Sequence, residues 1–182
     1  MSKLKQYKMF IDGEWVDSDT KKTFETLNPE NNKPWAVVPE ASTKDVDKAV
    51  KAAQTAFEGA WPKLLPRERA KFLRAIGEKL RENAELLGKI ETIDTGKLFK
   101  ETKTQANYIA EYYDYYAGLA DKVEGTVLPI DKANMQVITT RVPIGVVAAI
   151  IPWNSQMLLT AVKLAPALAM GNTIVILSLI HI

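Results

Sequence analysis

Short apolar runs separated by polar turn residues predict several strands in the first 40 positions. Two such runs flank Asp12-Gly13 and predict a tight hairpin within residues 7–18, because both turn positions of an Asp-Gly turn favour positive φ. A further short strand is predicted at 23–26, and an extended segment at 33–39 follows a polar turn. The chain is therefore expected to open with β structure.

Apolar residues at helical spacing then predict a first helix. Ser42 or Thr43 can cap its N-terminus, and the carboxylates of Asp45 and Asp47 lie near the positive end of its dipole. The helix is expected to end near Gly59. Its apolar face consists of Val46, Ala49, Val50, Ala53 and Phe57.

A second helical pattern follows Trp61-Pro62, a pair that we expect to be extended because proline disfavours the helical conformation of the residue before it. Pro66 can open the second helix at its first turn. The apolar spacing allows this helix to divide into two segments that meet near Asn83, and Gly96 is suited to end it.

A third helix is predicted over 101–121, and it is rich in tyrosine. A tyrosine cluster can line a ligand site, but at helical spacing it is more typical of helix packing with the hydroxyls at the boundary. The tyrosines are Tyr108, Tyr112, Tyr113, Tyr115 and Tyr116.

Two β-type runs, 126–130 and 135–140, surround a polar segment and predict a second hairpin within 123–142. An isolated hairpin is only marginally stable in water, so we expect it to pack on something else, with another subunit as a candidate.

An unalternating apolar run at 145–151 predicts a strand that is covered on both faces. It is followed by a predicted helix at 156–170 and a second apolar strand at 173–176. Strand, helix and strand with short joints predict a βαβ unit of a parallel sheet, so the fold class is α/β.

Composition narrows the possible functions. The 182 residues carry a net charge of +2, which predicts neither nucleic acid nor an anionic membrane as a partner. The absence of cysteine excludes disulfides, thiolate metal sites and a cysteine nucleophile within this chain. Residues 1–10 lack an apolar signal core, and polar residues and prolines divide the apolar stretch 142–180 into runs too short for a membrane span, so we expect a cytoplasmic protein.

The end of the first parallel strand is the position where ligands bind in open α/β sheets. Pro152, Trp153 and Asn154 occupy that position. The Asn154 amide could hold a developing oxyanion beside the flat wall of Trp153, or it could cap the next helix. The glycine-rich and phosphate-loop fingerprints of nucleotide binding are absent, and His181, the only histidine, has no partner at motif spacing that would make it a base.

The segments 141–154 and 163–173 resemble the NAD(P)-dependent aldehyde dehydrogenase superfamily, and the likeness extends back through 91–97 to 11–15. The resemblance implies an incomplete N-terminal part of that fold: helices, a βαβ unit of a parallel sheet and a protruding β-hairpin. Residues 1–122 and 143–176 would be the N-terminal part of the cofactor-binding domain, and 123–142 the oligomerisation hairpin of a homodimer or homotetramer.

The same resemblance implies site residues. Asn154 matches the oxyanion-hole asparagine, and Asp94, with the backbone carbonyls of Thr26 and Leu27, matches a monovalent-cation site of some members. From the residues alone, a solvated surface carboxylate is the better interpretation of Asp94. The segment along the NAD or NADP cofactor consists of Ile150, Ile151, Pro152, Trp153 and Asn154.

Departures from the family qualify this assignment. Leu177 stands where the family has a cofactor-binding lysine, and residues 177–182 resemble a translated sequencing adapter, so we expect them to be a non-native tail. The catalytic cysteine and the general-base glutamate of the family are absent as well. The parent enzyme would oxidise an aldehyde to a carboxylate with NAD(P)+, whereas this chain alone is expected to be inactive and poorly soluble.

Two other interpretations stay open. One is a non-catalytic interaction module that pairs with a full-length subunit through the hairpin at 123–142. The other is a small-ligand binding protein that uses the turn at Trp153 and Asn154.

Overall fold

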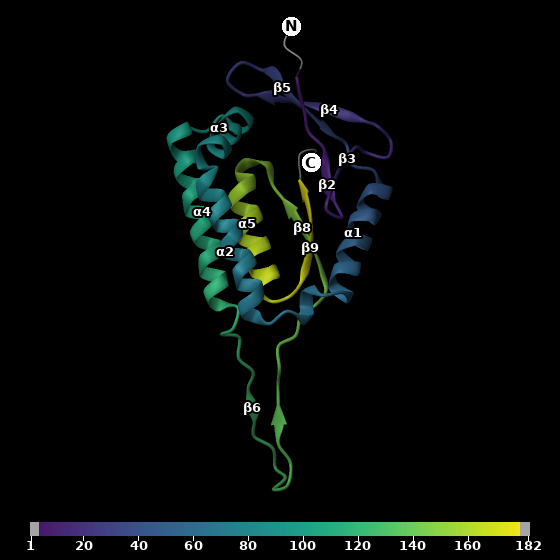
Figure 1. Ribbon diagram of the computed structural model, residues 1–182, viewed down its shortest axis with the longest axis vertical. Coiled ribbons are helices and arrows are strands. Elements are labelled where there is room, and N and C mark those ends of the chain that lie inside the picture. The colour runs from purple at the N-terminus through teal and green to yellow at the C-terminus, as the bar shows by residue number, and fades with distance from the viewer. Residues whose placement is uncertain (1–3, 179–182) are drawn as a thin grey trace.

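The computed structural model describes residues 4–178, which form an α/β arrangement with a long projection (Figure 1). The strands are β1 (Lys5–Gln6), β2 (Met9–Ile11), β3 (Glu14–Val16), β4 (Thr23–Asn28), β5 (Lys33–Pro39), β6 (Val127–Leu128), β7 (Val137–Ile138), β8 (Val146–Ile151) and β9 (Thr173–Ser178). The helices are α1 (Thr43–Glu58), α2 (Pro66–Glu82), α3 (Ala84–Thr95), α4 (Phe99–Leu119) and α5 (Gln156–Ala169), with short 3-10 turns at Trp61–Lys63 and Trp153–Ser155.

The N-terminal part confirms the predicted hairpin and adds a small sheet. Strands β2 and β3 pair antiparallel around Asp12 and Gly13, whose φ angles of 54° and 79° are those the turn requires. Strand β4 continues to Asn28, two residues beyond the predicted strand, because its pairing with β5 resumes after a register shift at Thr26/Leu27. Strand β1 was not predicted, because its two residues are too few to show a periodicity.

Helix α1 begins at the predicted place, and Ser42 rather than Thr43 is its cap. The backbone amide and hydroxyl of Ser42 both donate to the Asp45 carboxylate, at 2.9 and 2.8 Å. The Ser18 hydroxyl (2.9 Å) and the Asp19 amide (3.1 Å) donate to the same carboxylate. Burial raises the pKa of Asp45, but these hydrogen bonds outweigh it and lower the pKa to about 2. Asp45 therefore joins the N-terminal segment to α1.

Helices α2 and α3 meet at Asn83 as predicted, and α3 ends at Gly96 with a left-handed φ of 75°. The expectation of an extended Trp61-Pro62 step is wrong, because a 3-10 turn forms there with proline in its first turn, and the chain becomes extended only at Leu64 and Leu65.

Helices α2, α4 and α5 pack together into a helical layer with a continuous apolar core. Leu73 is fully buried in it. Tyr113 is buried as well, which confirms the packing interpretation at that position, and burial raises its pKa to about 12. Tyr108 and Tyr115 are instead mostly exposed. The core residues are Ala70, Leu73, Ile109, Tyr113, Ala117, Ala120, Ala161, Ala165 and Ala169.

The predicted βαβ unit is confirmed. Strands β8 and β9 pair in parallel from Val146↔Thr173 to Ile151↔Ser178, with α5 on one side and α1 on the other (Figure 1). The expectation that β8 is covered on both faces is wrong for the described chain, since Ile150 is 58% exposed. Strand β9 continues beyond the predicted strand at 173–176 through Leu177 and Ser178, the first two residues of the expected non-native tail. Residues 179–182, including His181, lie outside the described part of the chain.

The segment 123–142 projects away from the rest of the molecule (Figure 1). Its strands β6 and β7 pair over only two residues each, which is shorter than the apolar runs predict. The pairing is extended by Thr126 and Thr139, where the Thr139 amide donates to the Thr126 carbonyl at 2.8 Å. Within residues 4–178, none of the helices has the length and apolar character that crossing a membrane requires.

Candidate functional site

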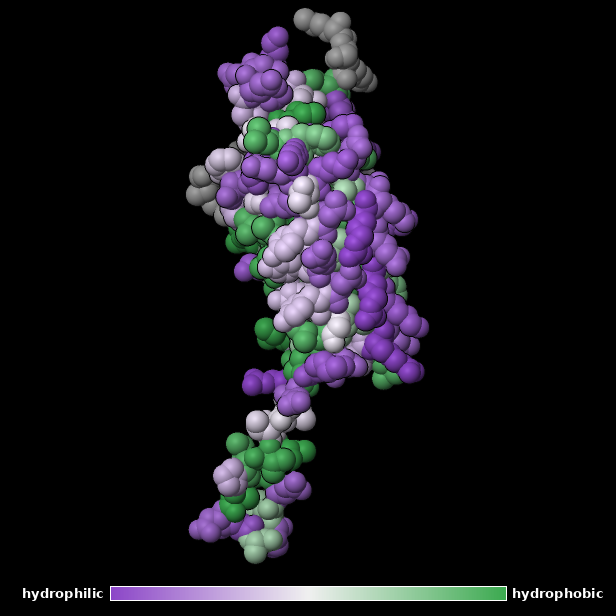
Figure 2. Space-filling view, turned by 90° about the vertical axis from the view of Figure 1, so that its left-hand side faces the viewer, coloured by the Kyte–Doolittle hydropathy of each residue, from purple (hydrophilic) through white to green (hydrophobic). Residues whose placement is uncertain are grey.

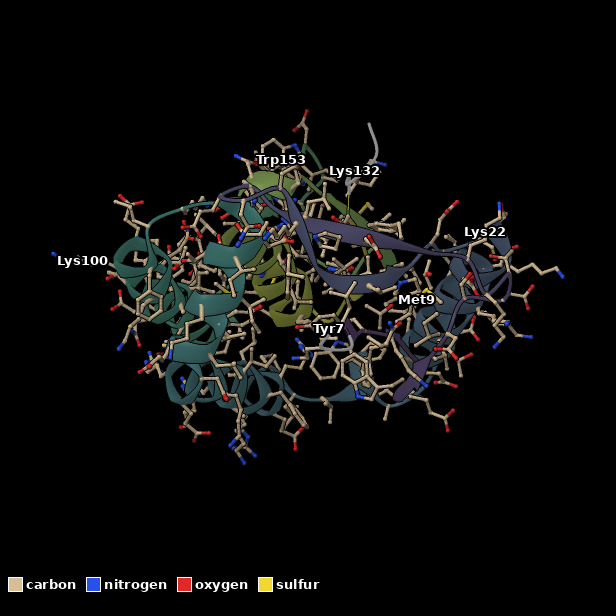
Figure 3. All side chains as sticks on the ribbon, turned by 90° about the horizontal axis from the view of Figure 1, so that it is seen from above. Tyr7, Met9, Lys22, Lys100, Lys132 and Trp153 are labelled. Carbon is tan, nitrogen blue, oxygen red and sulfur yellow. The ribbon has the colours of Figure 1, made fainter. Side chains whose placement is uncertain are left out.

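The chain turns sharply at the C-terminal end of β8. Ile151 is buried at the strand end, Pro152 is extended, and Trp153, Asn154 and Ser155 form a 3-10 turn that leads into α5. Trp153 is 57% exposed and lies at the edge of the molecule when it is seen from above (Figure 3). The predicted place of this segment, at the end of a parallel strand, is therefore confirmed.

Asn154 is exposed, and its side-chain amide makes no hydrogen bond to any residue between 4 and 178. The residue at the cap position of α5 is Ser155, and no side-chain hydrogen bond caps this helix. The capping role that Asn154 could have had is thus not seen. Its amide is free to donate to a ligand.

Asp94 contacts the side chains of Thr26 and Gln156. The Thr26 hydroxyl donates to Oδ1 of Asp94 at 2.7 Å, and Nε2 of Gln156 donates to Oδ2 at 2.9 Å. The expectation for Thr26 and Leu27 concerns their backbone carbonyls, and it stays a prediction. Asp94 is half-buried rather than a solvated surface group, and each of its oxygens keeps a lone pair beyond the hydrogen bond shown.

The described residues form no cluster of charged metal ligands. Residues 4–178 contain no group of three His, Cys, Asp or Glu side chains that could hold a metal. The oxygen donors brought together here are the Asp94 carboxylate and the Thr26 hydroxyl, and oxygen donors are the ligands that hard cations prefer.

A second polar cluster lies next to the turn, and it was not predicted. Nζ of Lys97 lies 3.1 Å from Oε1 of Glu91 and 3.0 Å from the Ser155 hydroxyl. Nε2 of Gln105 on α4 donates to the same hydroxyl at 3.1 Å. Glu91 and Lys97 are visible in the sequence as neighbouring opposite charges, but nothing in it shows that Lys97 meets a residue 58 positions later.

An open groove of about 1370 Å³ separates the N-terminal strands and α1 from β9. Its walls are largely apolar and include Ile150 and Ile176, while Asp94 and Gln156 form part of its polar lining. Tyr7 and Trp35 also line it, and neither the Tyr7 hydroxyl nor the Trp35 indole N–H has a hydrogen-bond partner in the described structure. The groove shows that one face of the β8–β9 pair is accessible.

The comparisons with known proteins agree with this geometry. The profile of the aldehyde dehydrogenase family matches residues 15–178. A (Z)-2-((N-methylformamido)methylene)-5-hydroxybutyrolactone dehydrogenase from Acinetobacter baylyi is 46% identical over 174 residues, which are 95% of this chain and 35% of that protein. Aldehyde dehydrogenase 1 from Tanacetum cinerariifolium is 45% identical over 95% of this chain and 35% of its own length.

Solved structures are similar to the same extent. Betaine aldehyde dehydrogenase from Staphylococcus aureus, in complex with NAD+, matches with a TM-score of 0.90 and 37% identity over 94% of this chain and 34% of its own. An NAD-dependent aldehyde dehydrogenase from Sinorhizobium meliloti matches with a TM-score of 0.92 and 29% identity over 96% of this chain and 35% of its own. The chain spans about a third of the length of these relatives, and it belongs to the aldehyde dehydrogenase family.

Proposed function

We propose that this chain supplies the oxyanion donor and one wall of the cofactor site of an enzyme that oxidises an aldehyde to a carboxylate. The observation that carries the proposal is the free, exposed amide of Asn154 at the C-terminal end of β8. When a thiolate adds to an aldehyde, negative charge develops on the carbonyl oxygen, and a donor fixed in place stabilises it. Because the 182 residues contain no cysteine, another part of the enzyme must supply the thiolate.

The cofactor would lie along residues 150–154. The exposed side chains of Ile150 and Trp153 offer it an apolar wall, and the buried Ile151 anchors the strand end between them. When bound, NAD+ or NADP+ accepts the hydride that leaves the substrate carbon. The Staphylococcus aureus relative was solved with NAD+, which supports NAD+ for this enzyme.

Two further elements belong to the proposal. A monovalent cation at Asp94, with the carbonyls of Thr26 and Leu27, would tie β4 to the end of α3.

The hairpin 123–142 would pair with another subunit in a homodimer or homotetramer, which is supported by its largely exposed apolar side chains. These are Val123, Val127, Leu128, Ile130, Met135, Ile138 and Val142.

A chimera tests the role of Asn154. Residues 1–176 would be joined to the sequence that follows the matching position in the Acinetobacter baylyi relative, and the chimera would be assayed for aldehyde-dependent NADH formation. Asn154→Ala should lower kcat by about 10²- to 10³-fold, the usual cost of losing one oxyanion donor. Asn107→Ala, which removes an exposed amide on α4, is the control and should leave kcat unchanged. An active Asn154→Ala chimera with an unchanged kcat would refute the assignment.

The chain by itself gives a second test. Purified residues 1–182 should form no NADH from aldehyde and NAD+, and calorimetry should detect no micromolar NAD+ binding. Turnover by the purified chain would contradict the first expectation. Micromolar binding without turnover would instead favour a small-ligand binding protein.

The exposed hairpin also favours a non-catalytic interaction module as an alternative function. Such a module should co-purify with a full-length subunit of the family through 123–142. Failure of the two chains to associate when they are co-expressed would remove this alternative.

A further inference from the structure

The C-terminal end of α3 presents three charged residues to the turn that carries Asn154. Glu91, Asp94 and Lys97 are spaced by three positions, and Lys97 follows the cap at Gly96. Asp94 and Lys97 each bond one of the two residues that immediately follow Asn154, namely Gln156 and Ser155. Contacts from a separate helix therefore hold the exit of the turn.

Lys97 occupies a defined position because its partner is buried. The Glu91 side chain is only 3% exposed, and Lys97 contacts its Oε1 at 3.1 Å. The other oxygen, Oε2, has no hydrogen-bond partner in the described structure. A buried carboxylate that has lost its only cation is strongly unfavourable, so the ammonium group is held beside Glu91.

The same ammonium group reaches the turn. It donates to the Ser155 hydroxyl at 3.0 Å, while Gln105 on α4 donates to that oxygen at 3.1 Å. Ser155 is thus bonded by Lys97, which follows α3, and by Gln105 on α4. The preceding residues, Trp153 and Asn154, are exposed and have no such side-chain bonds between residues 4 and 178, so their geometry depends on the anchored Ser155 at the end of the turn.

We propose that Lys97 is a positioning residue, which is held by buried Glu91 and fixes the turn that presents the Asn154 amide. This inference rests on the proposed function of Asn154 and adds to it the group that sets the direction of the amide. An oxyanion donor acts only if it is already oriented when the charge develops, and errors of about 1 Å cost a large part of the rate.

The chain contains a matched control on α3, the helix that Lys97 follows. Lys89 and Glu85 also form an ion pair on α3, at 2.8 Å, but their side chains are 57% and 59% exposed and Lys89 does not contact the turn. Exposed pairs of this kind contribute little to stability. Lys97→Met and Lys89→Met therefore remove the same charge from the same region of the fold, and they differ in the burial of the paired glutamate and in the contact with Ser155.

Hydrogen exchange measured by mass spectrometry on the whole chain tests the proposal. In peptides that span 150–158, Lys97→Met should raise the exchange rate at least about tenfold, as expected for the loss of one charge-assisted hydrogen bond. Lys89→Met should leave the rate in these peptides at the wild-type value. Lys97→Arg, which keeps the charge, should restore part of the protection. Equal exchange at 150–158 in Lys97→Met and Lys89→Met would overturn the proposal.

If Lys97→Met fails to fold, which the absence of cooperative unfolding would show, a second variant tests the positioning role. Ser155→Ala removes the acceptor and leaves the Glu91–Lys97 pair intact, so exchange should rise at 150–158 while peptides from α3 stay protected. Unchanged exchange at 150–158 in Ser155→Ala would also overturn the proposal. Neither measurement depends on turnover. In the chimera, Lys97→Met should lower kcat with little change in KM. An unchanged kcat in Asn154→Ala would refute the catalytic role of Asn154, but it would not affect the hydrogen-exchange evidence that Lys97 positions the turn.

Discussion

The helical layer of α2, α4 and α5 and the hairpin 123–142 are both rich in apolar residues, but they use them differently. In the layer, Leu73 and Ile109 are buried against neighbouring helices of the same chain. In the hairpin, Ile138 is 62% exposed, and Figure 2 shows hydrophobic side chains gathered on the projection below a largely hydrophilic body. The layer is therefore stable through its own contacts, whereas the hairpin needs another surface to cover it.

The largest effect is expected in the core of the layer. Leu73→Ala should lower the free energy of unfolding by about 2–5 kcal/mol, because it leaves a cavity at a fully buried position. Urea unfolding followed by far-UV circular dichroism measures the change. Leu86→Ala, at a largely exposed position on α3, is the control and should change the free energy by no more than about 0.5 kcal/mol. Equal losses in both variants would show that the layer is not a packed core.

Acid should weaken the body of the molecule through Asp45. The pKa of this carboxyl is about 2 in the folded chain, below its value of about 3.9 in an unfolded chain. Its contribution to stability is therefore complete above pH 4 and is lost as the pH falls from about 4 to about 2.

Urea unfolding between pH 5 and pH 2 measures this loss. Asp45→Asn should be less stable than the wild type at pH 5, and the difference should shrink toward pH 2. Asp47→Asn removes a less buried carboxylate from the same helix and should show no such convergence. A difference between wild type and Asp45→Asn that stays constant over this range would contradict the assignment.

A substitution at the base of the hairpin should act locally. A Cβ atom at Gly125 would overlap the Thr139 carbonyl oxygen, so Gly125→Ala should break the hydrogen bonds between Thr126 and Thr139. Faster exchange of the Thr139 amide, with an unchanged unfolding midpoint of the helices, is the expected result. Gly118→Ala on α4 has open space around it and should instead stabilise the chain by up to about 1 kcal/mol. Retained protection at Thr139 in Gly125→Ala would show that the backbone accommodates the added Cβ without breaking this hydrogen bond.

The smallest effect on stability is expected on the exposed faces of the hairpin. The double variant Val127→Thr and Ile138→Thr should change the free energy of unfolding by less than about 0.5 kcal/mol, because both side chains are largely exposed. Its self-association, measured by sedimentation velocity, should nevertheless fall below that of the wild type. Unaltered association would mean that contacts between chains form elsewhere, with the open β8–β9 face as the next surface to test.

Much of the fold could be predicted from local pattern. The Asp-Gly turn, the break at Asn83 and the cap at Gly96 depend on residue types that tolerate backbone conformations which other residues avoid, and all three are confirmed. Local pattern gave the wrong conformation where contacts with distant residues determine it, as at Trp61. This residue lies in a 3-10 turn, and its indole N–H donates to the Asn172 carbonyl at 3.0 Å.

The candidate site also has a part that the sequence predicts and a part that it does not. The position of Asn154 at a strand end follows from the order of strand, turn and helix, and that order is readable from the chain. The contacts of Lys97 with Ser155 and of Asp94 with Gln156 join residues about 60 positions apart, and no periodicity reports such a pairing.

The sequence by itself determined the order of the elements, the parallel βαβ unit, the place of Asn154 and the absence of a thiol, because these depend on residue identity and short-range spacing. The tertiary structure alone decided which apolar surfaces are covered and which are left open. It also decided that Asp45 is a buried link rather than a solvated carboxylate, and that α3 holds the turn behind Asn154. Burial and hydrogen bonding at these positions arise only when segments distant in the chain are brought within a few ångströms of each other.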